Sequence, residues 1–457
     1  MSDPKRQTAR QVAFWVLNKF DVNRHDAGEL LHKRISLTDQ RGQATDLVYG
    51  AIRNMPAIDM VIEQAGSTPI KRISKKLLAI LRIGAYELIY APQTAEYAIV
   101  NEAVDLTHSV TGKKPAGFVN AVLRNLTRAI VCRDASLEGG DLRKTLPQSE
   151  TNGWAFKDDV LPDPEADPSD YLSKGFSIPD WLVRGWISEF DLEVARGICF
   201  ASNRRPGIFL AANTLKVSAE GLLEKLRAEG IECAGPGESG LLKLKSHVPV
   251  SEIAGFSEGL FTVQDPAQVL PVRMLLPKPG QRVLDMCAAP GGKTVQMAQM
   301  MEDRGSMIAS DIDVERLVKV DDNCKRLGIT IVKTVIVDEA SGDFDAVLVD
   351  APCSNTGVMA RRCEVRLRIN ENAVKELAKT QLQLLTKAGE MVKAGGRICY
   401  STCSIMKDEN SGVVESFLAE NKSFVLESEK LTLPSLSKTD DTTFDHDGGY
   451  AAIILKR

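Results

Sequence analysis

The stretch from Arg282 to Thr294, RVLDMCAAPGGKT, decides the class of fold. Its first residues read as a short apolar strand, its middle as a tight turn of small residues, and its end as the start of a helix. Such a turn lets a ligand approach both the backbone and the N-terminus of the helix. From Pro266 onward, apolar strands alternate with helical segments, which predicts a parallel sheet covered on both faces. Ligands of such sheets bind beyond the carboxyl ends of the strands.

Two kinds of ligand fit this loop. Residues 287–294, CAAPGGKT, differ at one position from the phosphate-binding pattern G-x-x-x-x-G-K-[ST], and AVLVD at 346–350 resembles a strand whose acid holds magnesium. The other ligand is S-adenosylmethionine, whose ribose hydroxyls require an acid at the end of the next strand. Asp311 ends that strand, 26 residues after Asp285, near the spacing of about 20 in dinucleotide folds. The loop favours S-adenosylmethionine but leaves a nucleoside triphosphate open.

Length and composition restrict the remaining classes. A chain of 457 residues with 44% hydrophobic and 26% charged residues is typical of a soluble protein with several domains. Its nine cysteines are too few for a disulfide scaffold, and its start, MSDPKRQTARQVAFWVLNKF, has no signal-peptide apolar block, so we expect a cytoplasmic protein with free thiols. No apolar run approaches the roughly 18 to 20 residues of a membrane span.

Charge and pattern divide the chain into four segments. Residues 1–135 read as consecutive helices and hold 19 Lys and Arg against 13 Asp and Glu. The cluster Lys71, Arg72, Lys75 and Lys76 could form a footprint for nucleic acid or simply a solvated face. Residues 136–172, with 3 basic and 9 acidic residues, predict a linker without a core, and 173–262 predict a small α+β domain. Residues 263–457 predict a Rossmann-like domain.

Two cysteines follow two of the predicted strands. Cys353 lies in Asp350-Ala351-Pro352-Cys353-Ser354 and Cys403 in the segment YSTCS at 400–404, so both thiols should lie over the same sheet edge as the glycine loop. No metal site is expected, because the spacing of Cys399 and Cys403 is not of a zinc-finger type and all five histidines lie elsewhere.

A thiol, a carboxylate and a methyl donor together suit one reaction. Carbon 5 of a pyrimidine is a poor nucleophile, and a thiolate that adds to carbon 6 pushes electron density onto it. An acid at the N3 side of the ring stabilises the charge that develops, and a base must later remove the carbon 5 proton. Cys403, Asp350 and Cys353 are candidates for these roles, although spacing alone does not assign them.

The motifs together resemble one family. DMCAAPGGKT, DAPCS followed by TGV and an Arg pair, and YSTCS followed by Glu409-Asn410 are similar, in this order, to RsmB-like members of the RsmB/Nop/Sun group of RNA cytosine-5 methyltransferases. LRIGAYELIY and GFVNAVLRNL resemble the NusB-like RNA-binding domain of the bacterial branch, and an RRM-like middle domain is expected between the two. The resemblance implies that Cys403 is the nucleophile and that Cys353 assists product release. It implies cofactor contacts from the following residues: Cys287, Ala288, Ala289, Pro290, Gly291, Gly292, Lys293, Asp311, Asp338 and Asp350.

The chain departs from the family pattern beside the predicted substrate loop. Asn355 stands where Gly is usual, and Cys363-Glu364 replaces Pro-Asp after the Arg pair. Asp338 has rivals in Glu339 and Asp343. The loop also carries four arginines that we expect to contact RNA phosphates or to lie in solvent: Arg361, Arg362, Arg366 and Arg368.

The sequence therefore predicts a monomeric three-domain enzyme that uses S-adenosylmethionine to methylate carbon 5 of a cytosine in RNA. Small-subunit ribosomal RNA is the substrate that the resemblance implies. Two alternatives remain at this point: a P-loop-type ATPase that acts on RNA, and a non-catalytic RNA-binding antitermination or assembly factor.

Overall fold

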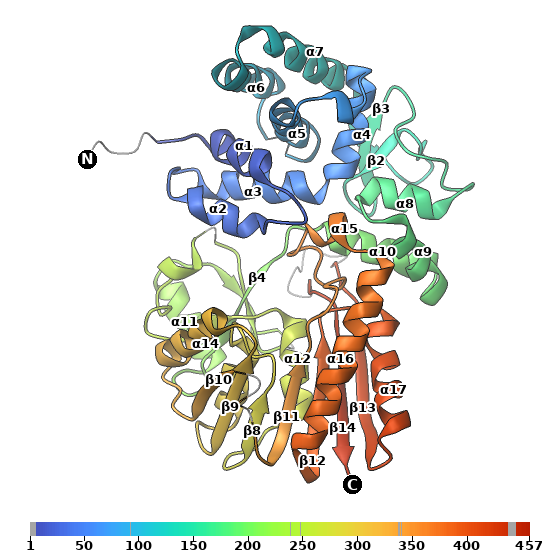
Figure 1. Cartoon of the computed structure of the whole chain (residues 1–457). Helices are drawn as coiled ribbons and strands as arrows, with labels where there is room; N and C mark the ends of the chain where they lie inside the picture. The colour runs from blue at the N-terminus through green and yellow to red at the C-terminus, as the bar shows by residue number, and fades with distance from the viewer. Residues whose placement is uncertain are drawn as a thin grey trace. The chain divides into compact units, whose positions relative to one another are not determined.

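The computed structural model describes residues 6–457 apart from 92, 238, 247, 337, 338, 340 and 437–444. The chain divides into two compact units, one of residues 1–203 with Arg362–Arg368 and one of Arg204–Arg361 with Ile369–Arg457 (Figure 1). Among the described residues, no helix has the length and apolar character that a membrane crossing requires.

The first unit begins with a bundle of helices, as the sequence predicts. Its members are α1 Ala9–Lys19, α2 Ala27–Ile35, α3 Arg41–Arg53, α4 Met55–Gly66, α5 Lys75–Tyr90, α6 Glu96–Thr111 and α7 Lys113–Ala129. A capping box of Thr8 and Gln11 starts α1. Apolar residues at helical spacing form the core, with Leu81, Leu88 and Leu126 all buried.

The acidic segment 136–172 is not a linker without a core, which corrects the sequence prediction. It contributes to an antiparallel sheet in the order β1-β3-β2, made of β1 Ile130–Ser136, β2 Thr145–Pro147 and β3 Asn152–Phe156. Leu146, Trp154 and Phe156 are buried, although their spacing follows neither helix nor strand periodicity for long. Three further helices complete this part: α8 Pro168–Phe176, α9 Asp180–Glu189 and α10 Leu192–Asn203. Most of the acids lie in the connections between these short elements, whereas Pro147 ends β2 and Pro168 and Asp170 lie in the first turn of α8.

The second unit starts with a small antiparallel sheet in the order β5-β6-β4-β7. Its elements are β4 Ile208–Ala212, α11 Ala219–Ala228, β5 Cys233–Ala234, β6 Leu242–Leu244 and β7 Phe261–Val263. Leu210, Leu226 and Phe261 belong to its buried core. The α+β domain predicted between the helical and Rossmann-like parts is therefore present.

A seven-stranded sheet in the order β10-β9-β8-β11-β12-β14-β13 forms the rest of this unit. The strands are β8 Arg282–Asp285, β9 Ser306–Asp311, β10 Val332–Ile336, β11 Phe344–Asp350, β12 Val392–Thr402, β13 Phe424–Thr432 and β14 Gly449–Lys456. The first five are parallel, but β14 pairs antiparallel with both β12 and β13. The sheet is thus mixed, which corrects the prediction of a parallel sheet. The sequence did not reveal this, because an apolar run such as YAAIIL does not indicate the direction of its strand.

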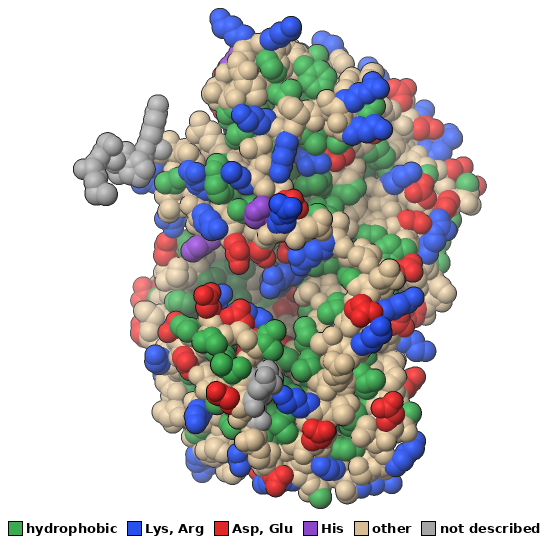
Figure 2. Space-filling view, in the orientation of Figure 1, with side chains coloured by type: hydrophobic (Ala, Val, Ile, Leu, Met, Phe, Trp, Pro, Cys, Tyr) green, Lys and Arg blue, Asp and Glu red, His purple; other side chains and the backbone are tan. Residues whose placement is uncertain are grey.

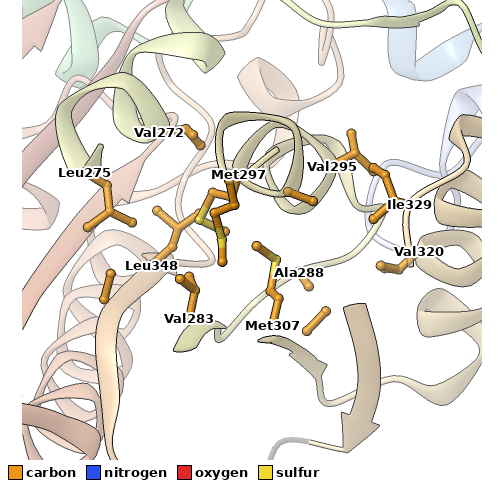
Figure 3. Close-up of a cluster of buried hydrophobic side chains, with 14 of the residues drawn as sticks. Val272, Leu275, Val283, Ala288, Val295, Met297, Met307, Val320, Ile329 and Leu348 are labelled. Carbon is orange, nitrogen blue, oxygen red and sulfur yellow. The ribbon is translucent and has the colours of Figure 1, made fainter. Parts of the chain in front are cut away.

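Helices cover both faces of this sheet, as Figure 1 shows for α16 and α17 on one face. They are α12 Pro266–Leu275, α13 Gly292–Met300, α14 Val314–Leu327, α16 Glu371–Met391 and α17 Ser411–Glu420. Leu348 of β11 points into a core that includes Val272 and Val320 (Figure 3), whereas its neighbour Val347 packs in the opposite core with Leu385. α13 packs on the same face as Leu348, through Val295 and Met297.

Candidate active site

The glycine loop connects β8 to α13 at the edge where the strand order reverses between β8 and β11. Asp311, at the end of β9, accepts a hydrogen bond from the Ala289 N–H at 3.2 Å and lies 3.5 Å from the Arg316 guanidinium. The Arg316 side chain also donates to the Ala289 carbonyl at 2.9 Å. The acid that the sequence assigned to a ribose is therefore held directly against the loop, and its side chain is 5% exposed.

Lys293, the basic residue of the loop, is paired with Asp350 instead of standing free. Its ammonium lies 2.7 Å from Asp350 Oδ2 and donates to Gln268 Oε1 at 2.6 Å. Burial acts to lower the pKa of Lys293, but its acidic neighbours together, Asp350 foremost, raise it. Ser401 donates to the other Asp350 oxygen at 2.9 Å. An ammonium engaged in this way does not match the phosphate-binding lysine of a P-loop.

The two thiols meet as the strand pattern predicts. β11 and β12 are adjacent parallel strands with Asp350 opposite Ser401, so the residues that follow them leave the sheet side by side. Cys353 Sγ lies 3.0 Å from Cys403 Sγ, and both side chains are partly buried. Asp350 is the last residue of β11, three residues before Cys353. One edge of the sheet therefore carries two thiols and an ion pair.

A buried glutamate, Glu409, ties together the two loops that hold the thiols. It accepts hydrogen bonds from the Ser354 N–H at 2.8 Å, from Ser404 Oγ at 2.5 Å and from Gln381 Nε2 at 3.0 Å, and also from Ser354 Oγ. Sequence reasoning gave Glu409 no role beyond its place in a motif. The available signal was that each cysteine is followed directly by a serine, and both serines bind this one carboxylate.

Several predicted residues behave differently from expectation. Asp338 lies outside the described residues, so its assignment stays a prediction. Arg361 forms ion pairs with Asp265 at 2.8 Å and Asp447 at 2.5 Å, which corrects its expected role at RNA phosphates or in solvent. The remaining arginines belong to the segment 362–368, which packs as part of the first unit.

Arg366 was expected to contact RNA phosphates or to lie in solvent, and this expectation is wrong. The residue is buried inside the first unit, where it is 3% exposed. Its guanidinium donates to the carbonyls of Arg53, Phe176 and Ser202 at 2.8 to 2.9 Å and to Asn203 Oδ1 at 2.5 Å. Burial lowers its pKa to about 10. Cys363 and Glu364 are buried in the same segment, so these two departures from the family pattern affect packing.

Three family models match the chain in the order of its domains. The NusB family matches residues 7–128, the ferredoxin-like domain of RsmF/B-like methyltransferases matches 178–251, and 16S rRNA methyltransferase RsmB/F matches 272–447. The probable ribosomal RNA small subunit methyltransferase B of Bacillus subtilis is 30% identical over 433 residues, covering 92% of this chain and 90% of the relative. The chain belongs to the RsmB/F family.

Solved structures agree with this membership of the RsmB/F family. The crystal structure of PH0851 aligns over 99% of this chain and 100% of its own with a TM-score of 0.72, and its 24% identity shows the shared fold. A methyltransferase homolog protein from Pyrococcus horikoshii is 27% identical, covers 64% of this chain and 99% of its own, and has a TM-score of 0.54. Membership of the RsmB/F family favours a methyltransferase over the ATPase and over the non-catalytic factor.

The loop fits S-adenosylmethionine, the methyl donor of the RsmB/F family. Asp285 Oδ1 is buried and has no hydrogen-bond partner among the described residues, while Oδ2 accepts from Thr294 Oγ1 at 2.7 Å. Burial raises the pKa of Asp285 to about 7. A Cβ added at Gly292 would meet open space, so the loop leaves room for a ligand there. A buried acceptor without a protein partner at the start of this loop suits a ligand that carries hydroxyl groups.

The two glycines of the loop are predicted to respond differently to valine. Gly291 has a φ of 102° and a Cβ there would lie 3.2 Å from Val320 Cα, so Gly291→Val should lower the free energy of unfolding by about 1 to 3 kcal/mol. Gly292→Val should leave thermal stability nearly unchanged and abolish S-adenosylmethionine binding in calorimetry. Undiminished binding by Gly292→Val would contradict the placement of the cofactor at this loop.

Proposed function

We propose that this ribosomal RNA methyltransferase modifies carbon 5 of a cytosine in small-subunit ribosomal RNA through a covalent adduct with Cys403. The observation that carries the proposal is the pair of thiols 3.0 Å apart beside the Asp350 and Lys293 ion pair. Methyl transfer to a ribose or to an exocyclic nitrogen requires no thiol nucleophile, whereas carbon 5 requires one to be activated. Bound S-adenosylmethionine supplies the methyl group.

The proposed reaction forms and breaks one bond to the protein. The Cys403 thiolate adds to carbon 6, and the electrons of the 5,6 double bond move to carbon 5, which takes the methyl group. A base then removes the carbon 5 proton, the double bond forms again, and the bond between Cys403 Sγ and carbon 6 breaks. The same thiolate is regenerated, so each cycle is complete without an oxidant or reductant.

The surroundings of Cys353 support this division of roles. Its pKa is raised well above the usual range by its hydrogen bond with Cys403, by burial, and by the nearby charges of Cys403 and Glu409. A thiol that keeps its proton is a poor nucleophile, which leaves the attack to Cys403. Once Cys403 is bonded to carbon 6, two of these causes vanish. The pKa of Cys353 then falls from its raised value, which favours Cys353 as the base at the step that needs one.

Asp350 and Lys293 are proposed to act on the base as a pair. A carboxylate that already accepts from an ammonium at 2.7 Å is an acceptor and suits the exocyclic amino group of cytosine. The Lys293 ammonium, rather than Asp350, is the donor that stabilises negative charge on the ring. Lys293 is therefore proposed to contact the substrate as well as the cofactor.

Mapping of 5-methylcytosine in total RNA from cells with and without the gene tests the proposal directly. We expect one site in the small-subunit RNA to lose its methyl group, and purified protein with S-adenosylmethionine to restore it. Loss of a ribose or N4 methyl group instead, with 5-methylcytosine unchanged, would overturn the assignment of carbon 5.

The basic cluster of the helical domain is proposed to bind RNA phosphates. Lys71, Arg72, Lys75 and Lys76 are all exposed, and on the visible face of the helices α5 to α7 Figure 2 shows more Lys and Arg than Asp and Glu side chains. Exchange of the four for Gln should weaken RNA binding and reduce its salt dependence, by about 0.7 to 0.9 in the logarithmic slope for each phosphate that the protein no longer neutralises. Fluorescence anisotropy at several salt concentrations measures this slope.

A matched variant controls for the removal of four charges. The exposed residues Lys278, Lys375, Lys379 and Lys422 lie in the other unit, and their exchange for Gln should leave the slope closer to that of the unchanged protein. Equal slopes for the two quadruple variants would show that the cluster in the helical domain has no special part in RNA binding.

A further inference from the structure

Asn355 follows Cys353 by two residues and stands in the first turn beyond β11. Its φ is 62°, a left-handed conformation that Gly adopts freely and Asn tolerates better than most residues. A Gly would therefore satisfy the backbone here without strain. Gly has no side chain, however, so the contacts of the Asn355 amide are not required by the turn itself.

The Asn355 amide contacts both thiol-bearing residues. Its Nδ2 donates to the Cys353 carbonyl at 2.9 Å, which only accepts, so the orientation of the amide is fixed. Its Oδ1 accepts from Cys403 Sγ at 3.1 Å. Because the Cys403 proton points to Asn355, the hydrogen between the two sulfurs belongs to Cys353. Cys353, Cys403 and Asn355 thus form a closed ring of three hydrogen bonds.

We propose that Asn355 is a positioning residue for Cys403, whose Sγ it holds beside Cys353 until the thiol loses its proton. The proposal rests on the proposed function in taking Cys403 as the nucleophile. The Asn355 carbonyl oxygen attracts Sγ only while the S–H is present. After ionisation the same oxygen repels the sulfur, and the S–H of Cys353 becomes its remaining donor in the ring.

Asn355→Gly and Asn355→Asp test this role by alkylation of Cys403 in the full-length protein without RNA or cofactor. Iodoacetamide labels the thiolate, and peptide mass spectrometry follows Cys403 separately from the other cysteines. Asn355→Gly removes an acceptor that favours the thiol, so half-maximal labelling should shift down by about 0.5 pH unit. Asn355→Asp places a carboxylate against the sulfur and should shift it up by about 1 unit or more.

Steady-state kinetics gives a second readout. Loss of the contact that places Cys403 Sγ beside Cys353 should lower kcat of Asn355→Gly by roughly three- to tenfold, with the KM for RNA unchanged, when kcat is compared above both labelling midpoints so that the easier ionisation of the variant does not offset the effect. Ser67→Gly is the control, because Ser67 also has a positive φ of 45° but lies in the first unit. It should change neither the labelling profile nor kcat.

The order Gly, Asn, Asp in the pH of half-maximal labelling is the result expected. Identical labelling profiles for Asn355→Gly and the unchanged protein would overturn the proposal and leave Asn355 as a residue that merely tolerates the turn. This outcome is separable from failure of the proposed function. Labelling needs no RNA, whereas a wrong function would appear as absence of 5-methylcytosine with the labelling order intact.

Discussion

Exchange of Cys353 for Ala is expected to leave methylated RNA attached to the protein through Cys403, whereas exchange of Cys403 for Ala should abolish methylation and attachment together. The first variant keeps the thiol that attacks but lacks the group proposed to remove the carbon 5 proton, so the adduct persists. The second lacks the attacking sulfur. A denaturation-resistant protein–RNA band that requires S-adenosylmethionine measures the difference, and the double variant should not form it.

The same experiment also tests the opposite assignment, in which Cys353 rather than Cys403 is the nucleophile. The two sulfurs are only 3.0 Å apart, so either could in principle face carbon 6. A stable band from Cys403→Ala and none from Cys353→Ala would make Cys353 the nucleophile. Cys399→Ala is a suitable control, because Cys399 is buried in β12 and its thiol donates to the Pro271 carbonyl, away from the pair.

Arg366→Met is expected to destabilise the first unit by at least about 3 kcal/mol. The substitution leaves three backbone carbonyls and the Asn203 side chain without their buried donor, and each such acceptor costs about 1 to 3 kcal/mol. All four tryptophans lie within residues 1–203, so tryptophan fluorescence during urea denaturation reports on this unit. The midpoint of that transition should fall clearly.

Arg362→Met is the matched control for this measurement. Arg362 belongs to the same segment, but its side chain is 57% exposed and lies 3.5 Å from Asp26, a surface pair of little energetic weight. Its loss should change the free energy of unfolding by about 0 to 1 kcal/mol. Equal stability of Arg366→Met and the unchanged protein would show that the buried guanidinium does not hold the segment in place.

The sequence allowed the meeting of Cys353 and Cys403 to be predicted because the ends of parallel strands share an edge. It did not reveal the partners of Asp350 or the shared bonds of Glu409, since those depend on the rotamers of side chains from separate elements. Arg366 shows the same limit. An arginine among other arginines suggests a phosphate contact, and only the packed structure reveals that carbonyls from three distant helices surround it.

The fold was predictable to a similar extent. Periodicity identified the helical domain and the strand and helix alternation, because burial of one face repeats regularly in both. It failed at 136–172, where short strands bury isolated residues such as Leu146 and Trp154 between acidic connections. It also failed at the direction of β14, since strand direction depends on the path of the connection and not on the strand's own residues.

The segment 362–368 has a consequence for the order in which the protein is made. Arg366 is synthesised 163 residues after Asn203, one of its partners in the first unit. At about 5 to 20 residues per second, the first 203 residues leave the ribosome roughly 8 to 30 seconds before that arginine. During this interval the carbonyls of Arg53, Phe176 and Ser202 lack the Arg366 donor that they have in the folded protein. We therefore expect the packing around these carbonyls to be completed only once the catalytic half has been translated.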